Sequence, residues 1–295
     1  MHRIARIAIA ALASVGMLAS VAACGSGQST SEKNGTIEVA ASVNQWGTVA
    51  KALGGDNVNV TSIINSTNVD AHDYEPTTSD IAKLQKAQVI IVNGAGYDAW
   101  AVKATQTANA TIVNAAEIGG VNDGENPHVW FSADVRKAVA QAITEAYEQA
   151  DAAKKNDFDK MNDRWTAEEN NVESKIAEVK QKTDGLAYAA TESVASYLAE
   201  DMGLADATPS GYARATANES EPTPTDIKQF TDALKAGEIK LLVVNTQEES
   251  ELTGKITDAA KSVEVPMVEL TEQMPEQYDS LTDWMAALVD AFSQA

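Results

Sequence analysis

The chain has 295 residues, 44 % of them hydrophobic, and a formal net charge of −21. This composition predicts one large folded domain or two modest lobes and excludes a wholly disordered chain. Such acidity argues against nucleic acid or an anionic lipid surface as a partner, because both are polyanions. By itself the charge indicates only solubility and a weak attraction for cations.

The first 23 residues differ from the rest. The basic start MHRIAR precedes the apolar run IAIAALASVGMLASVAA, and neither contains an acidic residue. This order is typical of a secretory signal peptide, so we predict one over residues 1–23. The segment ends in VAAC at Cys24, the single cysteine, an ending that resembles a bacterial lipobox. We predict that Cys24 carries lipid and that residues 24–35 form a flexible tether; an ordinary signal peptide with an incidental cysteine is the alternative.

Strand-like and helix-like segments alternate after the tether. Expected strands are TIEVAAS (36–42), NVNVTSII (57–64) and QVIIVNG (88–94), and expected helices are WGTVAKALGG (46–55) and TSDIAKLQKA (78–87). We expect Gly54 and Gly55 to close the first helix, since glycine tolerates a left-handed cap. Alternation of this kind is typical of a parallel α/β sheet.

A short motif occurs twice. EPTTSDI (75–81) returns as EPTPTDI (221–227), and in both copies a threonine precedes an aspartate by three positions. That spacing predicts a capping box at a helix start. An apolar strand follows each helix, over 88–94 and over 240–245. We therefore predict two α/β lobes of related topology; a chance match of a common cap signal is the alternative.

A helical stretch separates the two copies. Phe158, Trp165, Val172 and Val179 recur every seven residues on an otherwise charged or amide-bearing segment. One apolar stripe of this kind predicts a single helix packed along one face, about 40 Å long at 1.5 Å per residue. The predicted organisation is an N-terminal lobe over 36–154, a linking helix over 155–183 that braces both lobes, and a C-terminal lobe over 184–295.

The chain lacks the common motifs of catalysis and nucleotide binding. It contains no GxSxG, Walker loop, GxGxxG, CxxC or HExxH. After the predicted signal peptide only two histidines remain, His72 in VDAHDYEP and His128 in GENPHVWFS, both in polar loops. Neutral imidazole is the commonest metal ligand, although ordinary surface or capping histidines remain an alternative. Two histidines cannot complete a metal site, so carboxylates from elsewhere would be required.

The blocks around these histidines resemble a known family. DAHDYEPTTSDIAKLQKAQVIIVNGAGYDAW (70–100) is similar to the first ligand block of the zinc and manganese solute-binding lipoproteins of bacterial ABC importers. NPHVWFS (126–132) is similar to the second block, and the lipobox, the long helix and the repeated motif also match. The resemblance covers nearly the whole chain after the signal peptide. It implies an α/β fold with a metal site between two lobes.

The resemblance also implies the metal ligands. They are His72, His128, Glu192 in ATESVASYLAEDMGL and Glu272 in VPMVELTEQMPE, with Glu269 as the alternative to Glu272. The chain departs from the family pattern at Asn126, where an aspartate often precedes Pro-His, and at Asn245, where a glutamate often ends the strand. Neither position is a ligand in the family, so we expect them to alter the surroundings of the ligands.

The expected cargo is a divalent transition metal, with no organic cofactor. Two imidazoles with two carboxylates make a harder, more oxygen-rich site than three imidazoles, which favours Mn²⁺ with Zn²⁺ next. The stretch GGVNDGENPHVW also lacks the histidine-rich loop that many zinc receptors carry. Affinity of such sites nevertheless tends to rise from Mn²⁺ toward Cu²⁺ and stays high at Zn²⁺.

We expect a monomeric, non-enzymatic receptor on the outer face of the cytoplasmic membrane. It would be held by the lipid on Cys24 and would deliver its ion to an ABC permease. One alternative is a secreted metal-dependent hydrolase with a 2-His-carboxylate site, which would need an open coordination position and a general base. An organic-solute receptor is a further alternative, and an aromatic-lined pocket would be its sign.

Overall fold

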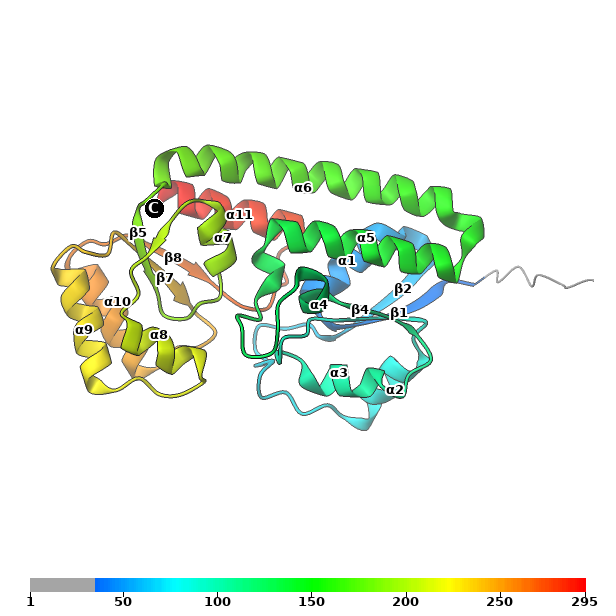
Figure 1. Ribbon diagram of the computed structural model, residues 1–295, viewed down its shortest axis with the longest axis horizontal. Helices are drawn as coiled ribbons and strands as arrows, with labels where there is room; N and C mark the ends of the chain where they lie inside the picture. The colour runs from blue at the N-terminus through cyan, green and yellow to red at the C-terminus, as the bar shows by residue number, and fades with distance from the viewer. Residues whose placement is uncertain (1–34) are drawn as a thin grey trace, which may run out of the picture. The chain divides into compact units, whose positions relative to one another are not determined.

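The computed structural model describes residues 35–295, so the predicted signal peptide, Cys24 and most of the predicted tether lie outside the described residues. Two four-stranded parallel sheets organise this part of the chain (Figure 1). The first has the order β2-β1-β3-β4, from β1 (Ile37–Val43), β2 (Val58–Ile64), β3 (Val89–Val92) and β4 (Thr111–Asn114). The second has the order β6-β5-β7-β8, from β5 (Ala187–Ala190), β6 (Ala205–Asp206), β7 (Leu241–Asn245) and β8 (Met267–Leu270).

The two sheets repeat one topology. In each sheet the first strand in sequence has the second strand on one side and the third strand on the other, and the fourth strand lies beyond the third. The prediction of two α/β lobes of related topology is thus confirmed. We call the part built on the first sheet the N-lobe and the part built on the second sheet the C-lobe.

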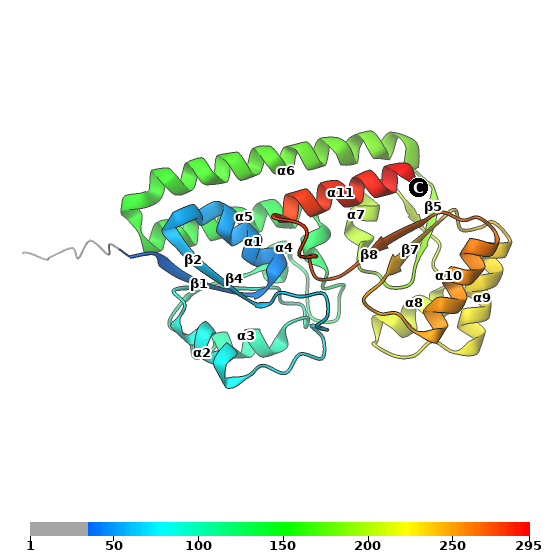
Figure 2. The ribbon, with the colours of Figure 1, turned by 180° about the vertical axis from the view of Figure 1, so that it is seen from behind.

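Helices cover both faces of the first sheet. The N-lobe helices are α1 (Asn44–Gly54), α2 (Thr78–Lys86), α3 (Ala99–Thr105), α4 (Ala115–Gly119) and α5 (Ala133–Ala150), with 3₁₀ turns η1 (Gly55–Asn57), η2 (Val129–Phe131) and η3 (Ala152–Lys154). Figure 2 shows α2 and α3 on the face of the sheet opposite α1 and α5. At the end of α1 Gly54 stays inside the helix, and Gly55 has a positive φ of 53° with a ψ of −127°, so the cap uses a glycine but not the left-handed α conformation expected from the sequence.

The C-lobe helices are α7 (Ser196–Asp201), α8 (Ser210–Ala217), α9 (Pro224–Lys235), α10 (Glu251–Ser262) and α11 (Leu281–Gln294). Both predicted capping boxes are present, at the starts of α2 and α9. In each box the threonine hydroxyl accepts from the aspartate N–H and the aspartate carboxylate accepts from the threonine N–H. Both boxes therefore satisfy N–H groups that a helix start would otherwise leave unpaired.

The long predicted helix is α6 (Lys155–Thr183), and it packs on both lobes. It contacts α5 and α1 of the N-lobe and α7 and α11 of the C-lobe (Figure 1). The predicted stripe is buried at every position, from Phe158 to Val179. Arg136 of α5 donates from Nε to Glu169 of α6 at 3.1 Å, with both side chains fully buried. This helix therefore joins the two lobes through apolar packing and a paired charge.

One apolar core runs through both lobes. It includes Trp46 of α1, Trp130 of η2, Trp165 of α6 and Trp284 of α11. Smaller clusters fill the remaining faces, one under α2 and α3 and another under α9 and α10. Each sheet is parallel and covered by helices on both faces. In such sheets ligands bind in the space beyond the carboxyl ends of the strands.

Candidate metal centre

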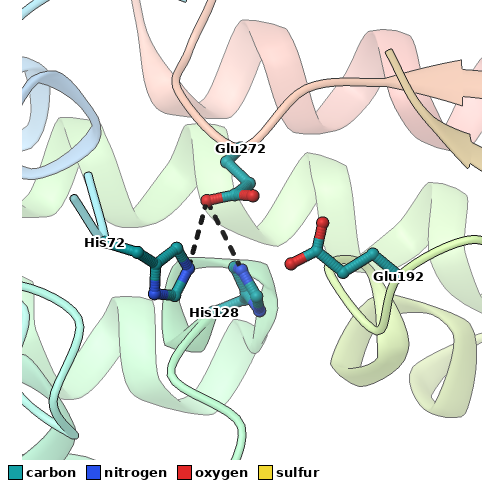
Figure 3. Close-up of side chains that lie close together, drawn as sticks. All are labelled: His72, His128, Glu192 and Glu272. Atoms are coloured by element: carbon teal, nitrogen blue, oxygen red, sulfur yellow. Dashed lines mark ion pairs between the residues drawn. The ribbon is translucent and has the colours of Figure 1, made fainter. Parts of the chain in front are cut away.

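The four predicted ligands come from loops on the carboxyl side of the two sheets. His72 lies in the loop between β2 and α2, and His128 directly precedes η2. Glu192 lies two residues beyond β5, and Glu272 two residues beyond β8. Two imidazoles from the N-lobe thus meet two carboxylates from the C-lobe, and Figure 3 shows all four side chains pointing toward one another.

These side chains are close enough to share one ion. One ligand atom from each lies within 4.8 Å of the other three. Glu272 Oε2 lies 3.6 Å from His72 Nε2 and 3.7 Å from His128 Nε2 (Figure 3). Ligands about 2 Å from a common ion lie roughly 3–4 Å from each other. The two distances from Glu272 Oε2 lie in this range, and the widest separation lies somewhat above it, so a small shift of the side chains would let all four hold one small cation.

The inner nitrogens of both imidazoles lack hydrogen-bond partners. His72 Nε2 and His128 Nε2 are buried, and neither makes a hydrogen bond within the described residues. His128 is 2 % exposed, and burial lowers the pKa of its imidazole, which favours the neutral form. A buried polar atom without a partner is costly, and a neutral imidazole nitrogen is a metal ligand. Both nitrogens are thus available to a cation.

The outer nitrogen of each imidazole is held. His128 Nδ1 lies 2.7 Å from Asn126 Oδ1, and His72 Nδ1 lies 3.2 Å from Glu219 Oε1. The Asp70 carboxylate also accepts a hydrogen bond from the backbone N–H of His72 at 2.8 Å, which shapes the loop around this histidine. A partner on the outer nitrogen fixes the ring orientation and leaves the inner lone pair for metal.

The two carboxylates share one amide donor. Asn245 Nδ2 donates to Glu192 Oε2 at 2.7 Å and to Glu272 Oε1 at 3.1 Å. Burial, then the nearby charge of Glu272, raises the pKa of Glu192 to about 8. Burial also opposes ionisation of Glu272, but the two imidazoles and the Tyr97 hydroxyl outweigh it and lower its pKa. Two acids this close repel when both are charged, and a cation would relieve that repulsion.

The loop that carries Glu272 is held by hydrogen bonds from both lobes, including several from the N-lobe. Gln45 Nε2 donates to the Glu272 carbonyl and Asn44 Nδ2 to the Met274 carbonyl, both at 2.7 Å. Tyr97 donates its hydroxyl hydrogen to Glu272 Oε2 at 2.9 Å. Sequence reasoning missed these contacts. The one available signal was a tyrosine in the polar loop GAGYDA directly after a buried strand.

Glu269, the alternative to Glu272, lies apart from the cluster. Glu269 is exposed on β8. Trp46 and Trp130 are fully buried in the core, and the ring centroid of Trp130 lies 5.3 Å from that of His128. Both departures from the family pattern, Asn126 and Asn245, hydrogen-bond directly to side chains of the cluster.

An acidic cavity leads to the cluster from outside. Its volume is about 630 Å³, and His72, Glu192 and Glu272 are among its lining residues. Further carboxylates line it, namely Asp70, Asp73, Glu219, Glu221, Glu248, Glu249 and Glu251. Lys255 also lines it, but carboxylates predominate, and a cavity walled mainly by negative charge concentrates cations, so this opening favours cations over anions.

Comparison with protein families gives one match over nearly all of the described chain. The family described as ZnuA, zinc-uptake complex component A, periplasmic, matches residues 39–295. Among individual relatives, the metal ABC transporter substrate-binding lipoprotein FimA of Streptococcus parasanguinis is 24 % identical over 250 residues, covering 79 % of each chain. The iron ABC transporter substrate-binding lipoprotein MtsA of Streptococcus pyogenes serotype M1 is 26 % identical over 236 residues, covering 72 % of this chain and 73 % of the relative.

Solved structures share the fold. The laminin-binding adhesin Lmb of Streptococcus agalactiae superposes with a TM-score of 0.74 at 19 % identity, covering 88 % of this chain and 98 % of that one. The periplasmic zinc-binding protein TroA of Treponema pallidum gives a TM-score of 0.74 at 15 % identity, covering 88 % and 99 %. The two-lobed architecture is thus that of known metal-binding proteins.

Proposed function

The chain belongs to the ZnuA family of metal receptors of ABC importers, and from that premise we propose that it binds one divalent transition-metal ion through His72, His128, Glu192 and Glu272. The observation that carries the proposal is the pair of buried, unpartnered imidazole nitrogens facing two carboxylates. In this proposal the ion is the cargo, and each lobe supplies half of its ligands. A site completed by four protein ligands suits a receptor, which needs no open position for a reacting water.

Mn²⁺ is the proposed cargo, with Zn²⁺ next. Two carboxylates give the site at least two oxygen ligands, which suit a harder ion than an all-imidazole site would. Relatives are named for different metals, manganese for PsaA of Streptococcus anginosus and iron for MtsA. Because affinities in such sites rise toward Cu²⁺ and stay high at Zn²⁺, the ligand set describes what the site is tuned for and leaves binding of other ions open.

The proposed partner is the membrane permease of an ABC importer. Several relatives are named as substrate-binding lipoproteins of such transporters. None of the helices of residues 35–295 combines the length and the hydropathy that a membrane span requires. We propose that lipid on Cys24 anchors a monomer at the outer face of the cytoplasmic membrane, with lobes at 36–154 and 184–295 and the linking helix at 155–183.

The hydrolase alternative has one structural feature in its favour, a cavity of several hundred Å³ beside the candidate site. The carboxylates of that cavity are better suited to cations than to an acidic substrate. The family is one of substrate-binding receptors, which supports a carrier over a catalyst. Coordination separates the two: four protein ligands at the ion fit the receptor, whereas three ligands and a water fit the hydrolase.

The test is metal loading of purified, tag-free protein. Chelator-stripped protein is reloaded with Mn²⁺ or Zn²⁺ separately, and bound metal and the rise in thermal midpoint are measured. We expect one ion per chain, because binding to the native state stabilises it by mass action. His72→Ala should lose most of the metal-induced rise, and Glu192→His should shift preference from Mn²⁺ toward Zn²⁺. A full rise in His72→Ala would remove His72 from the site, and unchanged relative shifts in Glu192→His would remove the selectivity argument.

A further inference from the structure

The side chain of Asn126 links the two lobes beside the candidate metal centre. Its Oδ1 accepts from the backbone N–H of His128 at 3.0 Å and lies 2.7 Å from His128 Nδ1. Its Nδ2 donates to the Ser193 carbonyl at 2.7 Å and contacts Ser196 Oγ at 2.6 Å. One carboxamide therefore contacts a loop of the N-lobe through its oxygen and a loop of the C-lobe through its nitrogen.

These partners determine which way the amide faces. The Ser193 carbonyl can only accept, so the Asn126 atom next to it must be the NH₂ group. The oxygen then faces His128, whose Nδ1 must donate to it. This leaves the lone pair of His128 on Nε2, the buried atom that faces Glu272. The amide thus selects the imidazole tautomer that a metal ligand requires.

The C-lobe side of this link adjoins a second candidate ligand. Ser193 directly follows Glu192 in the chain, and Ser196 begins α7. The next residue, Tyr197, donates its hydroxyl hydrogen to the Asn126 carbonyl at 2.8 Å. The segment with Glu192 and the segment with His128 are thus connected through both the side chain and the backbone of Asn126.

We propose that Asn126 is a positioning residue of the metal centre: it orients His128 Nε2 and sets the spacing between His128 and Glu192, so that contact between the lobes and retention of the ion depend on one another. This inference rests on the proposed function, because it takes His128 and Glu192 as ligands. An amide can perform both tasks at once, since it accepts on one side and donates on the other. A carboxylate in its place would still accept from His128 but would face the Ser193 carbonyl without a hydrogen to donate.

Two substitutions separate these tasks. Asn126→Asp keeps the acceptor for His128 and loses the donor to Ser193, and Asn126→Ala loses both. Asn114→Asp is the matched control: it adds the same charge in the N-lobe, and Asp preserves the role of Asn114 as N-cap of α4. Co²⁺ serves as the probe, with affinity by competition, dissociation by chelator chase, and the visible absorption of the bound ion as a report on ligand geometry.

We expect Asn126→Asp to weaken Co²⁺ binding by about tenfold, mainly through faster dissociation, and Asn126→Ala by up to about a hundredfold. The visible spectrum should change in both variants and stay as in wild type in Asn114→Asp. The thermal midpoint of metal-free protein is measured alongside, because a merely structural role would lower it without altering the spectrum. Wild-type affinity, dissociation and spectrum in Asn126→Asp would overturn the proposal.

A further variant tests the proposal if either Asn126 substitution prevents folding. Ser196→Ala removes one partner of Asn126 on the C-lobe side and leaves the bond to His128 intact, so we expect dissociation to be several-fold faster. Unchanged dissociation both in this variant and in a folded Asn126 variant would contradict the link between the lobes. If the Asn126 variants bind like wild type while His128→Ala does not bind, the role of Asn126 fails and the receptor function stands. If wild-type protein binds none of Co²⁺, Mn²⁺ and Zn²⁺, the proposed function itself fails.

Discussion

The two lobes share one topology but place different side chains at the candidate site, imidazoles from the N-lobe and carboxylates from the C-lobe. Each has the same strand order and a capping box before the helix that leads to its third strand. In the N-lobe the loop before that box carries His72, whereas the corresponding C-lobe loop carries Glu219, which meets His72 Nδ1 at 3.2 Å. Equivalent loops therefore meet across the site, one with an inward imidazole and the other with the acid behind it.

The capping boxes differ in their surroundings. Asp80 also accepts from the Tyr74 hydroxyl at 2.9 Å and from Lys83 at 3.0 Å, and it is buried. Asp226 is half-buried, and its carboxylate is bonded to Thr223. Tyr74 lies two residues from His72, so the more elaborate box anchors the loop of a candidate ligand. The capping box therefore starts a helix in both lobes, but only in the N-lobe does it also anchor a loop with a candidate metal ligand.

The largest expected effect comes from removing a C-lobe carboxylate. Glu272→Gln should lower metal affinity by about 100-fold, because it removes a charged ligand that faces both imidazoles. At a metal concentration 100 times the wild-type Kd, metal-induced stabilisation would fall from about 2.7 to about 0.4 kcal/mol. Glu269→Gln, exposed on the preceding strand, is the matched control and should keep wild-type affinity. Equal losses in both variants would contradict the assignment of Glu272.

A smaller effect is expected from the amide shared by the carboxylates. Asn245→Ala leaves Glu192 and Glu272 without their common donor, so their orientation toward the ion should loosen. We expect metal affinity to fall about 10–100-fold, the usual range for partners of metal ligands. Isothermal titration with Mn²⁺ and Zn²⁺ measures it. An unchanged affinity would show that the C-lobe carboxylates need no such support, unlike the imidazoles.

The comparison of the capping boxes gives a prediction about stability and pH. Hydrogen bonds from Thr77, Lys83 and Tyr74 outweigh burial and lower the pKa of Asp80. A depressed carboxyl pKa stabilises the fold above the unfolded-state value of about 4 and loses that contribution as pH falls below it. Asp80→Asn should therefore cost about 1–2 kcal/mol at pH 7, and the difference from wild type should narrow below about pH 4.

The matched change in the other box is Asp226→Asn. It should cost less than Asp80→Asn at pH 7, because Asp226 lacks the added bonds from a tyrosine and a lysine. Urea unfolding of both variants at pH 7 and pH 3 measures the difference. Equal losses of unfolding free energy at pH 7 would mean that the bonds from Tyr74 and Lys83 add nothing to the stability of the first box.

The smallest expected effect concerns the acid behind His72. Glu219 is 72 % exposed at its side chain, so its pairing with His72 is screened by solvent and salt. Glu219→Gln should weaken metal binding only two- to five-fold, in the range of exposed ion pairs, and the difference should shrink in high salt. Competition titrations at low and high salt test this. A loss as large as that in Glu272→Gln would place Glu219 among the ligands themselves.

Much of the fold was predictable because its signals are local. Period-two and apolar runs mark the strands, the seven-residue stripe marks α6, and a threonine three positions before an aspartate marks both capping boxes. His72 and His128 stood out as the only histidines after the predicted signal peptide, in blocks that resemble a family. These features depend on residues a few positions apart, and elementary periodicity or capping chemistry is enough to recognise them.

Tertiary structure decided which side chains lie together in the candidate centre. Sequence reasoning left Glu269 and Glu272 as alternatives. The fold exposes Glu269 on β8 and holds the next loop from Asn44 and Gln45, more than 200 residues earlier, so that Glu272 faces the imidazoles. The link from Asn126 to Ser193 spans 67 residues in the same way. No local pattern encodes such contacts, because they exist only once packing against α6 and the shared core has brought the loops beyond the carboxyl ends of the two sheets together.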